Sequence, residues 1–195
     1  SGCDNLSSGI CMNKDLTKAV LKANDVRTAR WLNVRSVEEI DYDKIEEMKY
    51  PVFIKPTSGG SSVATFKVKK KEDVEAAVVE GLKWDSEVLI EEFIKGSEVG
   101  CAVLGNEELT LGEVDEIEMG TEIFDFAEKY NHVTSKIHVP ARISKEIKEQ
   151  VYAYAKVVYR AMECKEWSRI DLFVSGDRVY FNELNTITGF PSDSR

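Results

Sequence analysis

Four polar side chains near the end of the sequence have the types and spacing of a metal and phosphate site. Arg169 and Asp171 lie two residues apart, and so do Glu183 and Asn185. Such pairs share one face of a strand, and the turn at 175–177 predicts a hairpin that joins them. Two carboxylates and an amide suit Mg²⁺, and an arginine can hold phosphate or a developing oxyanion. The ordinary polar face of a hairpin is the alternative, and this stretch alone does not decide.

A lysine before a glycine- and serine-rich stretch could serve the same chemistry. Lys55 ends the apolar run 52–56 and precedes the stretch 57–62. Loop N–H groups can turn towards phosphates while the lysine supplies a point charge. The sequence has neither G-x-x-x-x-G-K-S/T nor G-x-G-x-x-G, so a flexible hairpin tip is the simpler interpretation of this loop alone. The backbone of residues 91–94 could contact an adenine edge, and Glu98 could accept ribose hydroxyls.

Composition excludes several classes of protein. Within 195 residues, three Trp and eight Phe support a hydrophobic core, and the net charge of −9 argues against nucleic-acid binding. Four cysteines without a C-x-x-C pair and only two histidines do not suggest a zinc site. No apolar run approaches the roughly 20 residues of a membrane span, and no signal peptide is recognisable. We expect a soluble, cytoplasmic protein with reduced thiols and no membrane partner.

Apolar periodicity predicts the elements that must position these residues. Helices are expected after the N-cap Asn13, from a capping box at 36–39 to about residue 48, over 74–82, and after Pro140. Strands are expected at 52–56, 63–68, 88–94, 98–104 and 109–117, besides the C-terminal hairpin. The fold class is α+β with mainly antiparallel sheets, divided into a helical lead-in (1–48), a small subdomain (49–95) and a large one (96–195). The segment 118–138 lacks periodicity and is expected to be a mobile, functional loop.

The order of these features resembles the ATP-grasp enzymes, and most closely the D-alanine–D-alanine ligase family. That family includes D-alanine–D-serine ligases of the vancomycin-resistance type. The matching segments are Ser7-Ser8 with Met12–Lys14, Phe53–Pro56, Gly60–Val63, Glu128–Tyr130, Val139–Ala141, Ser168–Asp171 and Asn182–Thr186. The resemblance covers essentially the whole chain and implies two α+β subdomains that grip ATP between them.

The resemblance also implies roles for individual residues. Those expected to bind ATP are Lys14, Lys55 and Ser62, with Glu91, Phe93 and Ile94 at the adenine and Glu98 at the ribose. The expected ligands of two Mg²⁺ ions, for which Mn²⁺ could substitute, are Asp171, Glu183 and Asn185. ATP would phosphorylate the carboxylate of a first D-alanine, and the amine of a second D-amino acid would attack the acyl phosphate. The product would enter peptidoglycan synthesis.

The remaining implied roles concern the reacting groups and the loop over them. Arg169 and the N–H of Gly189 would stabilise the tetrahedral oxyanion. Lys129 and Tyr130, with Ser61, would close the lid 118–138 over the first D-alanine and keep water from the acyl phosphate. Ser194 and Arg195 would meet the carboxylate of the second substrate. The Lys129-Tyr130 pair favours an amino acid as second substrate, hence a peptide bond over an ester.

Some features depart from the family pattern, and they leave alternatives open. In the family an N-terminal domain precedes the ATP-grasp part, and a helix follows the position of Arg195, so we expect nucleotide binding without complete turnover. Thr188 stands where proline is frequent, and Ile123 where an aromatic residue often covers the adenine. The chain could instead be a non-catalytic ATP-binding fragment, or another ATP-grasp carboxylate–amine ligase. The choice between D-alanine and D-serine stays open, and full-length relatives are commonly homodimers.

Overall fold

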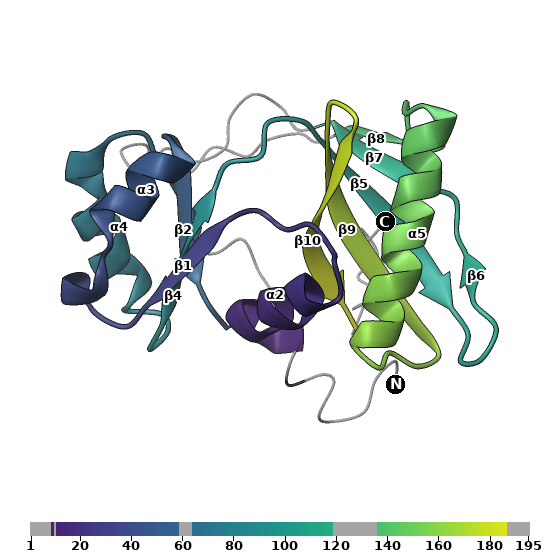
Figure 1. Ribbon diagram of the computed structural model, residues 1–195, viewed down its shortest axis with the longest axis horizontal. Helices are drawn as coiled ribbons and strands as arrows, with labels where there is room; N and C mark the ends of the chain where they lie inside the picture. The colour runs from purple at the N-terminus through teal and green to yellow at the C-terminus, as the bar shows by residue number, and fades with distance from the viewer. Residues whose placement is uncertain (1–8, 10, 59–63, 119–135, 187–195) are drawn as a thin grey trace.

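Two antiparallel sheets, each with its own hydrophobic core, form the framework of the protein (Figure 1). The computed structural model describes residues 9, 11–58, 64–118 and 136–186. The four-stranded sheet has the order β1-β4-β2-β3, with strands β1 (Trp31–Val34), β2 (Val52–Pro56), β3 (Phe66–Val68) and β4 (Val88–Glu92). Two helices, α3 (Tyr42–Met48) and α4 (Val74–Gly81), pack on one face, because alternate strand residues such as Val52 and Ile54 point into their shared core.

The six-stranded sheet carries the hairpin that the sequence singled out. Its order is β10-β9-β5-β7-β8, with β6 pairing only with β5. The strands are β5 (Ser97–Leu104), β6 (Thr110–Leu111), β7 (Asp115–Glu118), β8 (Lys136–His138), β9 (Trp167–Ser175) and β10 (Arg178–Asn185). The long helix α5 (Lys145–Ala161) begins at Ser144, whose hydroxyl accepts from the N–H of Ile147 at 3.2 Å. Its apolar face covers the core of this sheet (Figure 1).

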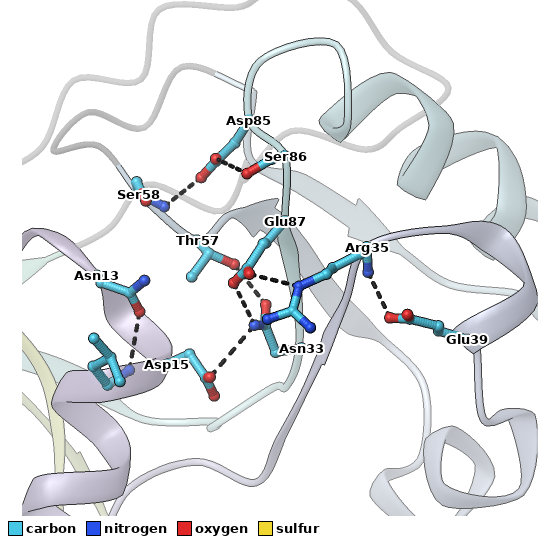
Figure 2. Close-up of polar contacts among 11 residues, drawn as sticks. Asn13, Asp15, Asn33, Arg35, Glu39, Thr57, Ser58, Asp85, Ser86 and Glu87 are labelled. Carbon is cyan, nitrogen blue, oxygen red and sulfur yellow. Dashed lines mark hydrogen bonds and ion pairs between the residues drawn. The ribbon is translucent and has the colours of Figure 1, made fainter.

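Helix α2 (Lys14–Ala23) lies between the two sheets (Figure 1). The side chain of Leu21 packs in the core of the six-stranded sheet, whereas the first turn of the helix is hydrogen-bonded to the end of the four-stranded sheet. The N–H of Lys14 donates to the carbonyl of Thr57 at 2.9 Å. Asn33 accepts from the Thr57 hydroxyl at 2.7 Å and donates to Asp15 and Glu87, as Figure 2 shows. Strand β1, helix α2 and the end of β2 are therefore joined at one point.

The α+β class, the antiparallel sheets and the Asn13 cap are confirmed: the Asn13 side chain accepts from the N–H of Leu16. The interpretation of residues 1–48 as helical was wrong at Trp31–Val34, which pair with β4 as an edge strand. The capping box at Ser36 was also wrong. Its side chain makes no cap, residues 37–39 form a 3₁₀ turn, and Asp41 caps α3 instead. The subdomain boundaries themselves stay a prediction.

Four further expectations need correction or fall outside the described residues. The single strand expected over 109–117 is divided into β6 and β7, and the expected strand 88–94 ends at Glu92. The segment 118–138 is not a loop throughout, because Glu118 belongs to β7 and residues 136–138 form β8. Strand β3 begins at Phe66, and position 63 lies outside the described residues. In the described ranges no helix has the length and apolar character needed to cross a membrane.

Candidate functional site

A cavity of about 200 Å³ lies between helix α2, the end of β2 and strand β10. It is lined by Cys11, Met12, Lys14, Thr17, Lys18, Lys55 and residues 181–186. Sites for drug-sized ligands usually measure about 300–1,000 Å³, so this space fits a part of a nucleotide rather than a whole one. The charges on the two sides of the cavity indicate which chemical groups it could bind.

On one side, two lysines hold one buried carboxylate. Glu91 accepts from Nζ of Lys55 at 2.9 Å and pairs with Nζ of Lys18 at 2.7 Å. Lys18 also donates to the carbonyl of Ala29 at 3.1 Å. Burial alone would raise the pKa of Glu91, but the two lysines lower it to about 2, so the carboxylate is ionised at neutral pH.

A third lysine leaves this side with an excess of positive charge. Lys14 donates to the carbonyl of Pro56 at 3.3 Å, and burial followed by repulsion from Lys55 lowers its pKa. Lys14, Lys18, Lys55 and Glu91 are called the cationic cluster below. Three lysines against one carboxylate give it a formal charge of +2. An anion that entered the cavity would relieve the repulsion between the lysines.

On the other side, the hairpin of β9 and β10 presents the residues expected to bind metal. Glu183 lies opposite Asp171 and Asn185 opposite Arg169, after a register shift between Phe181 and Glu183. Nδ2 of Asn185 donates to Oδ2 of Asp171 at 2.9 Å. Burial raises the pKa of Glu183, repulsion from Asp171 adds to this, and attraction from Lys14 opposes it. The nearby positive charge therefore does not fully offset the burial of the Glu183 carboxyl.

Arg169 is held by two carboxylates. Its Nε donates to Asp171 at 2.8 Å, and its two Nη atoms donate to Asp115 at 2.8 and 2.9 Å. Burial opposes the charge, but hydrogen bonds and attraction from both aspartates raise the pKa of Arg169 above its usual range. Arg169, Asp115, Asp171, Glu183 and Asn185 are called the anionic cluster below. Three carboxylates against one arginine give it a formal charge of −2.

The anionic cluster fits a hard cation by its chemistry. Two carboxylates and an amide are the oxygen donors that Mg²⁺ takes in proteins, usually together with water and substrate phosphates. Among the described residues, no group of three His, Cys, Asp or Glu side chains is placed to hold a metal by itself. A metal at Asp171 and Glu183 would therefore need Asn185, water or phosphate oxygens as further ligands.

The structure brings together some of the predicted residues and not others. Lys14, Lys55, Glu183 and Asn185 line the cavity, and Glu91, Arg169 and Asp171 contact them directly or through one another. Phe93, Ile94 and Glu98 are not among the described residues that line it, and the ring of Phe93 packs on Phe53 at 5.7 Å. The predicted residues outside the described ranges are Ser61, Ser62, Lys129, Tyr130, Gly189, Ser194 and Arg195.

Sequence reasoning missed Lys18 and Asp115. Lys18 follows Lys14 by four residues, which places both on one face of the helix, so their spacing could have indicated it. Asp115 gave no such signal, because its approach to Arg169 depends on the pairing of β5 with both β7 and β9.

Comparison with known proteins decides the family. The chain matches the family model for the D-ala D-ala ligase C-terminus over residues 14–195. It belongs to the D-alanine–D-alanine ligase family. It is 46% identical over all 195 residues to D-alanine–D-alanine ligase B of Clostridium perfringens strain 13, of which it covers 63%. It is 47% identical to a D-alanine–D-alanine ligase of Clostridium botulinum strain Alaska E43, of which it covers 64%.

Solved structures agree with this assignment. The VanG D-Ala:D-Ser ligase from Enterococcus faecalis has a TM-score of 0.92 and 42% identity, over 100% of this chain and 57% of that one. The Bacillus anthracis D-alanine–D-alanine ligase complexed with ATP has a TM-score of 0.82 and 28% identity, over 100% and 61%. The expected ATP-grasp fold is thereby confirmed. The chain spans less than two thirds of the length of these relatives and corresponds to their C-terminal part.

Proposed function

We propose that this chain is the ATP-grasp portion of a ligase that joins D-alanine to a second D-amino acid at the expense of ATP. The observation that carries the proposal is the opposition of charge across the cavity. The cationic cluster presents +2 to a phosphate chain, and the anionic cluster presents −2 to the Mg²⁺ that accompanies it. Phosphoryl transfer needs positioning and charge neutralisation more than covalent help from the protein.

Within the proposed reaction, each cluster has a distinct task. Lys14 and Lys55 would hold phosphate oxygens, while Lys18 keeps its ion pair with Glu91 when Lys55 turns to the nucleotide. Mg²⁺ bound by Asp171, Glu183 and Asn185 would supply neutralisation of the phosphate charge. The carboxylate of D-alanine would be phosphorylated, and the amine of the second substrate would then displace phosphate.

Arg169 would face the negative charge that develops on the D-alanyl carbonyl, together with the N–H of Gly189. Ser61, Lys129 and Tyr130 would enclose the first substrate, and Ser194 with Arg195 would bind the second. Ser62, Phe93, Ile94 and Glu98 complete the proposed nucleotide contacts. These assignments rest on the resemblance to the family.

The second substrate is proposed as D-alanine or D-serine. The clostridial relatives carry the name D-alanine–D-alanine ligase, and VanG the name D-Ala:D-Ser ligase. Either product would serve cytoplasmic synthesis of peptidoglycan precursors, and the D-serine product would also fit vancomycin resistance. We further propose that residues 49–95 and 96–195 are the subdomains that grip ATP, and that the full-length ligase is a homodimer.

Calorimetric titration of a non-hydrolysable ATP analogue into this chain tests the proposal. We expect binding that Mg²⁺ strengthens and that becomes tighter still in the presence of D-alanine. If D-serine tightens binding further at a second site when D-alanine alone does not, the ligase is of the D-alanine–D-serine type. Absence of analogue binding would contradict the proposal. Binding that neither D-amino acid affects would favour the non-catalytic ATP-binding fragment.

A further inference from the structure

The guanidinium of Arg169 reaches Asp115 by passing over the central strand β5. In the register of the sheet, Gly100 of β5 lies opposite Asp115 of β7 on one side and opposite Asp171 of β9 on the other. Arg169 itself lies opposite Ala102. Its side chain therefore crosses one strand to contact a carboxylate two strands away.

The crossing requires that residue 100 has no side chain. A Cβ at Gly100 would lie 2.0 Å from Nη2 and 2.5 Å from Cζ of Arg169, and 2.9 Å from Oδ1 of Asp115. Each of these distances is shorter than a real Cβ tolerates, and all three atoms belong to the ion pair. Glycine is thus needed here for space, which the guanidinium fills.

Asp115 decides how the arginine divides its donors. Asp115 takes both Nη atoms, so Asp171 receives only Nε on Oδ1, while its Oδ2 accepts from Asn185. Without the Asp115 carboxylate, the guanidinium would be free to bind Asp171 through two parallel hydrogen bonds, which is its preferred geometry. An arginine in that position would compete with a metal for the same oxygens.

The charge of Asp115 also matters because the site is shielded from water. The side chains of Arg169, Asp115 and Asp171 are 18%, 15% and 11% exposed. An arginine that loses one partner in such surroundings turns to the nearest remaining carboxylate, because an unpaired charge is costly there. Within the anionic cluster the nearest is Asp171.

We propose that Asp115 and Gly100 are positioning residues that hold Arg169 across strand β5 and thereby keep the carboxylate of Asp171 available to Mg²⁺. Neither residue touches substrate or metal, and both act through Arg169. This inference rests on the proposed metal site for its functional consequence, but the position of the arginine is independent of it.

Crystal structures of the chain test the position directly. In Asp115→Asn we expect the guanidinium to leave β5 and bind Asp171 with two hydrogen bonds, and Gly100→Ala should expel it similarly. Gly112→Ala is the matched glycine control, since its Cβ would meet only Ala102, at 3.3 Å from that Cβ. A guanidinium that stays over β5 in Asp115→Asn would overturn the proposal, whether or not the chain binds nucleotide.

The Mg²⁺ requirement of nucleotide binding tests the consequence. Asp115→Asn should raise the half-saturating Mg²⁺ concentration about tenfold or more, with nucleotide affinity in the absence of Mg²⁺ unchanged. In an Arg169→Gln background, Asp115→Asn should change the half-saturating Mg²⁺ concentration by less than about twofold, because Asp115 acts through the arginine. Glu116→Gln, next along β7 and paired with Arg142, should leave it unchanged.

A structural role alone would lower the unfolding temperature of Asp115→Asn without changing its Mg²⁺ requirement, and that result would overturn the proposal. If the wild-type chain shows no Mg²⁺-dependent nucleotide binding, the proposed function fails, and the crystal structures still decide where Arg169 lies. The two failures are therefore distinguishable.

Discussion

Glu183 lines the cavity and Glu91 pairs with two lysines that line its other side, yet the pKa values of the two carboxyls are displaced in opposite directions. Two lysines lower the pKa of Glu91 to about 2, whereas burial raises that of Glu183. Glu91 is already neutralised within the protein, and Glu183 is not. The comparison separates a charge that is paired within the fold from a charge that we propose binds Mg²⁺.

The same contrast holds for the two clusters as wholes. In the cationic cluster, the ion pairs of Lys18 and Lys55 join α2 and β2 to β4, so breaking them should cost stability. In the anionic cluster, carboxylates outnumber the single arginine, so removing the carboxylate of Glu183 should cost ligand affinity rather than stability. Stability and ligand affinity should therefore respond differently to substitutions on the two sides.

The largest effect on stability is expected from Lys18→Met. The substitution removes one of two cations from the buried Glu91, and breaking such a pair typically costs about 3–5 kcal/mol, so we expect about 3 kcal/mol because Lys55 remains. Urea unfolding measures the loss. Lys22→Met, on the exposed face of the same helix, is the control, and equal losses in the two variants would contradict the account of the cationic cluster.

The second prediction concerns how the stabilising effect of Glu91 depends on pH. Because the pKa of Glu91 falls from 4.5 in the unfolded chain to about 2 in the folded one, its stabilising effect is present above pH 4.5 and is lost as the pH falls towards about 2. The stability advantage of the wild type over Glu91→Gln should therefore be smaller at about pH 3 than at about pH 6. An advantage that does not change with pH would show that the carboxylate is not held in its ionised form.

A smaller effect is expected from Asn33→Ala, which removes one of the contacts between helix α2 and the four-stranded sheet without removing a charge. Asn33 donates to Glu87 at 2.7 Å and accepts from Thr57, as Figure 2 shows. Losing these bonds should cost about 1–2 kcal/mol in unfolding free energy. The Mg²⁺ requirement of nucleotide binding should not change, and a changed requirement would mean that this contact belongs to the metal site.

The smallest expected effect is a gain in stability rather than a loss. Because the pKa of Glu183 is raised in the folded protein, its stabilising effect is present below pH 4.5 and is lost as the pH rises through the folded pKa. Glu183→Gln should therefore raise the unfolding temperature slightly at neutral pH without Mg²⁺. Thermal unfolding measures this, and Asn182→Ala on the same strand is the comparison. A clear destabilisation would mean that Glu183 stabilises the fold.

The parts of the site that are local in sequence could be predicted, and the parts that depend on distant pairing could not. The hairpin joins Arg169 and Asp171 to Glu183 and Asn185 within a short stretch, so the sequence predicted that the two pairs meet. The register shift between Phe181 and Glu183, which sets Glu183 opposite Asp171, could not be predicted from alternation. Asp115 contacts Arg169 from 54 residues away, through a register that only the assembled sheet defines. The short strand Trp31–Val34 was missed for the same reason, because its partner β4 lies far along the chain.

Calorimetric titration of a non-hydrolysable ATP analogue into two variants, with and without Mg²⁺, tests the central claim most directly. Lys55→Met should weaken binding under both conditions, since it removes a cation that we propose binds phosphate. Glu183→Gln should abolish only the part of the affinity that Mg²⁺ adds. If the two variants lose affinity in the same way, or if Mg²⁺ adds nothing to wild-type binding, the division of the cavity into a phosphate side and a metal side is wrong.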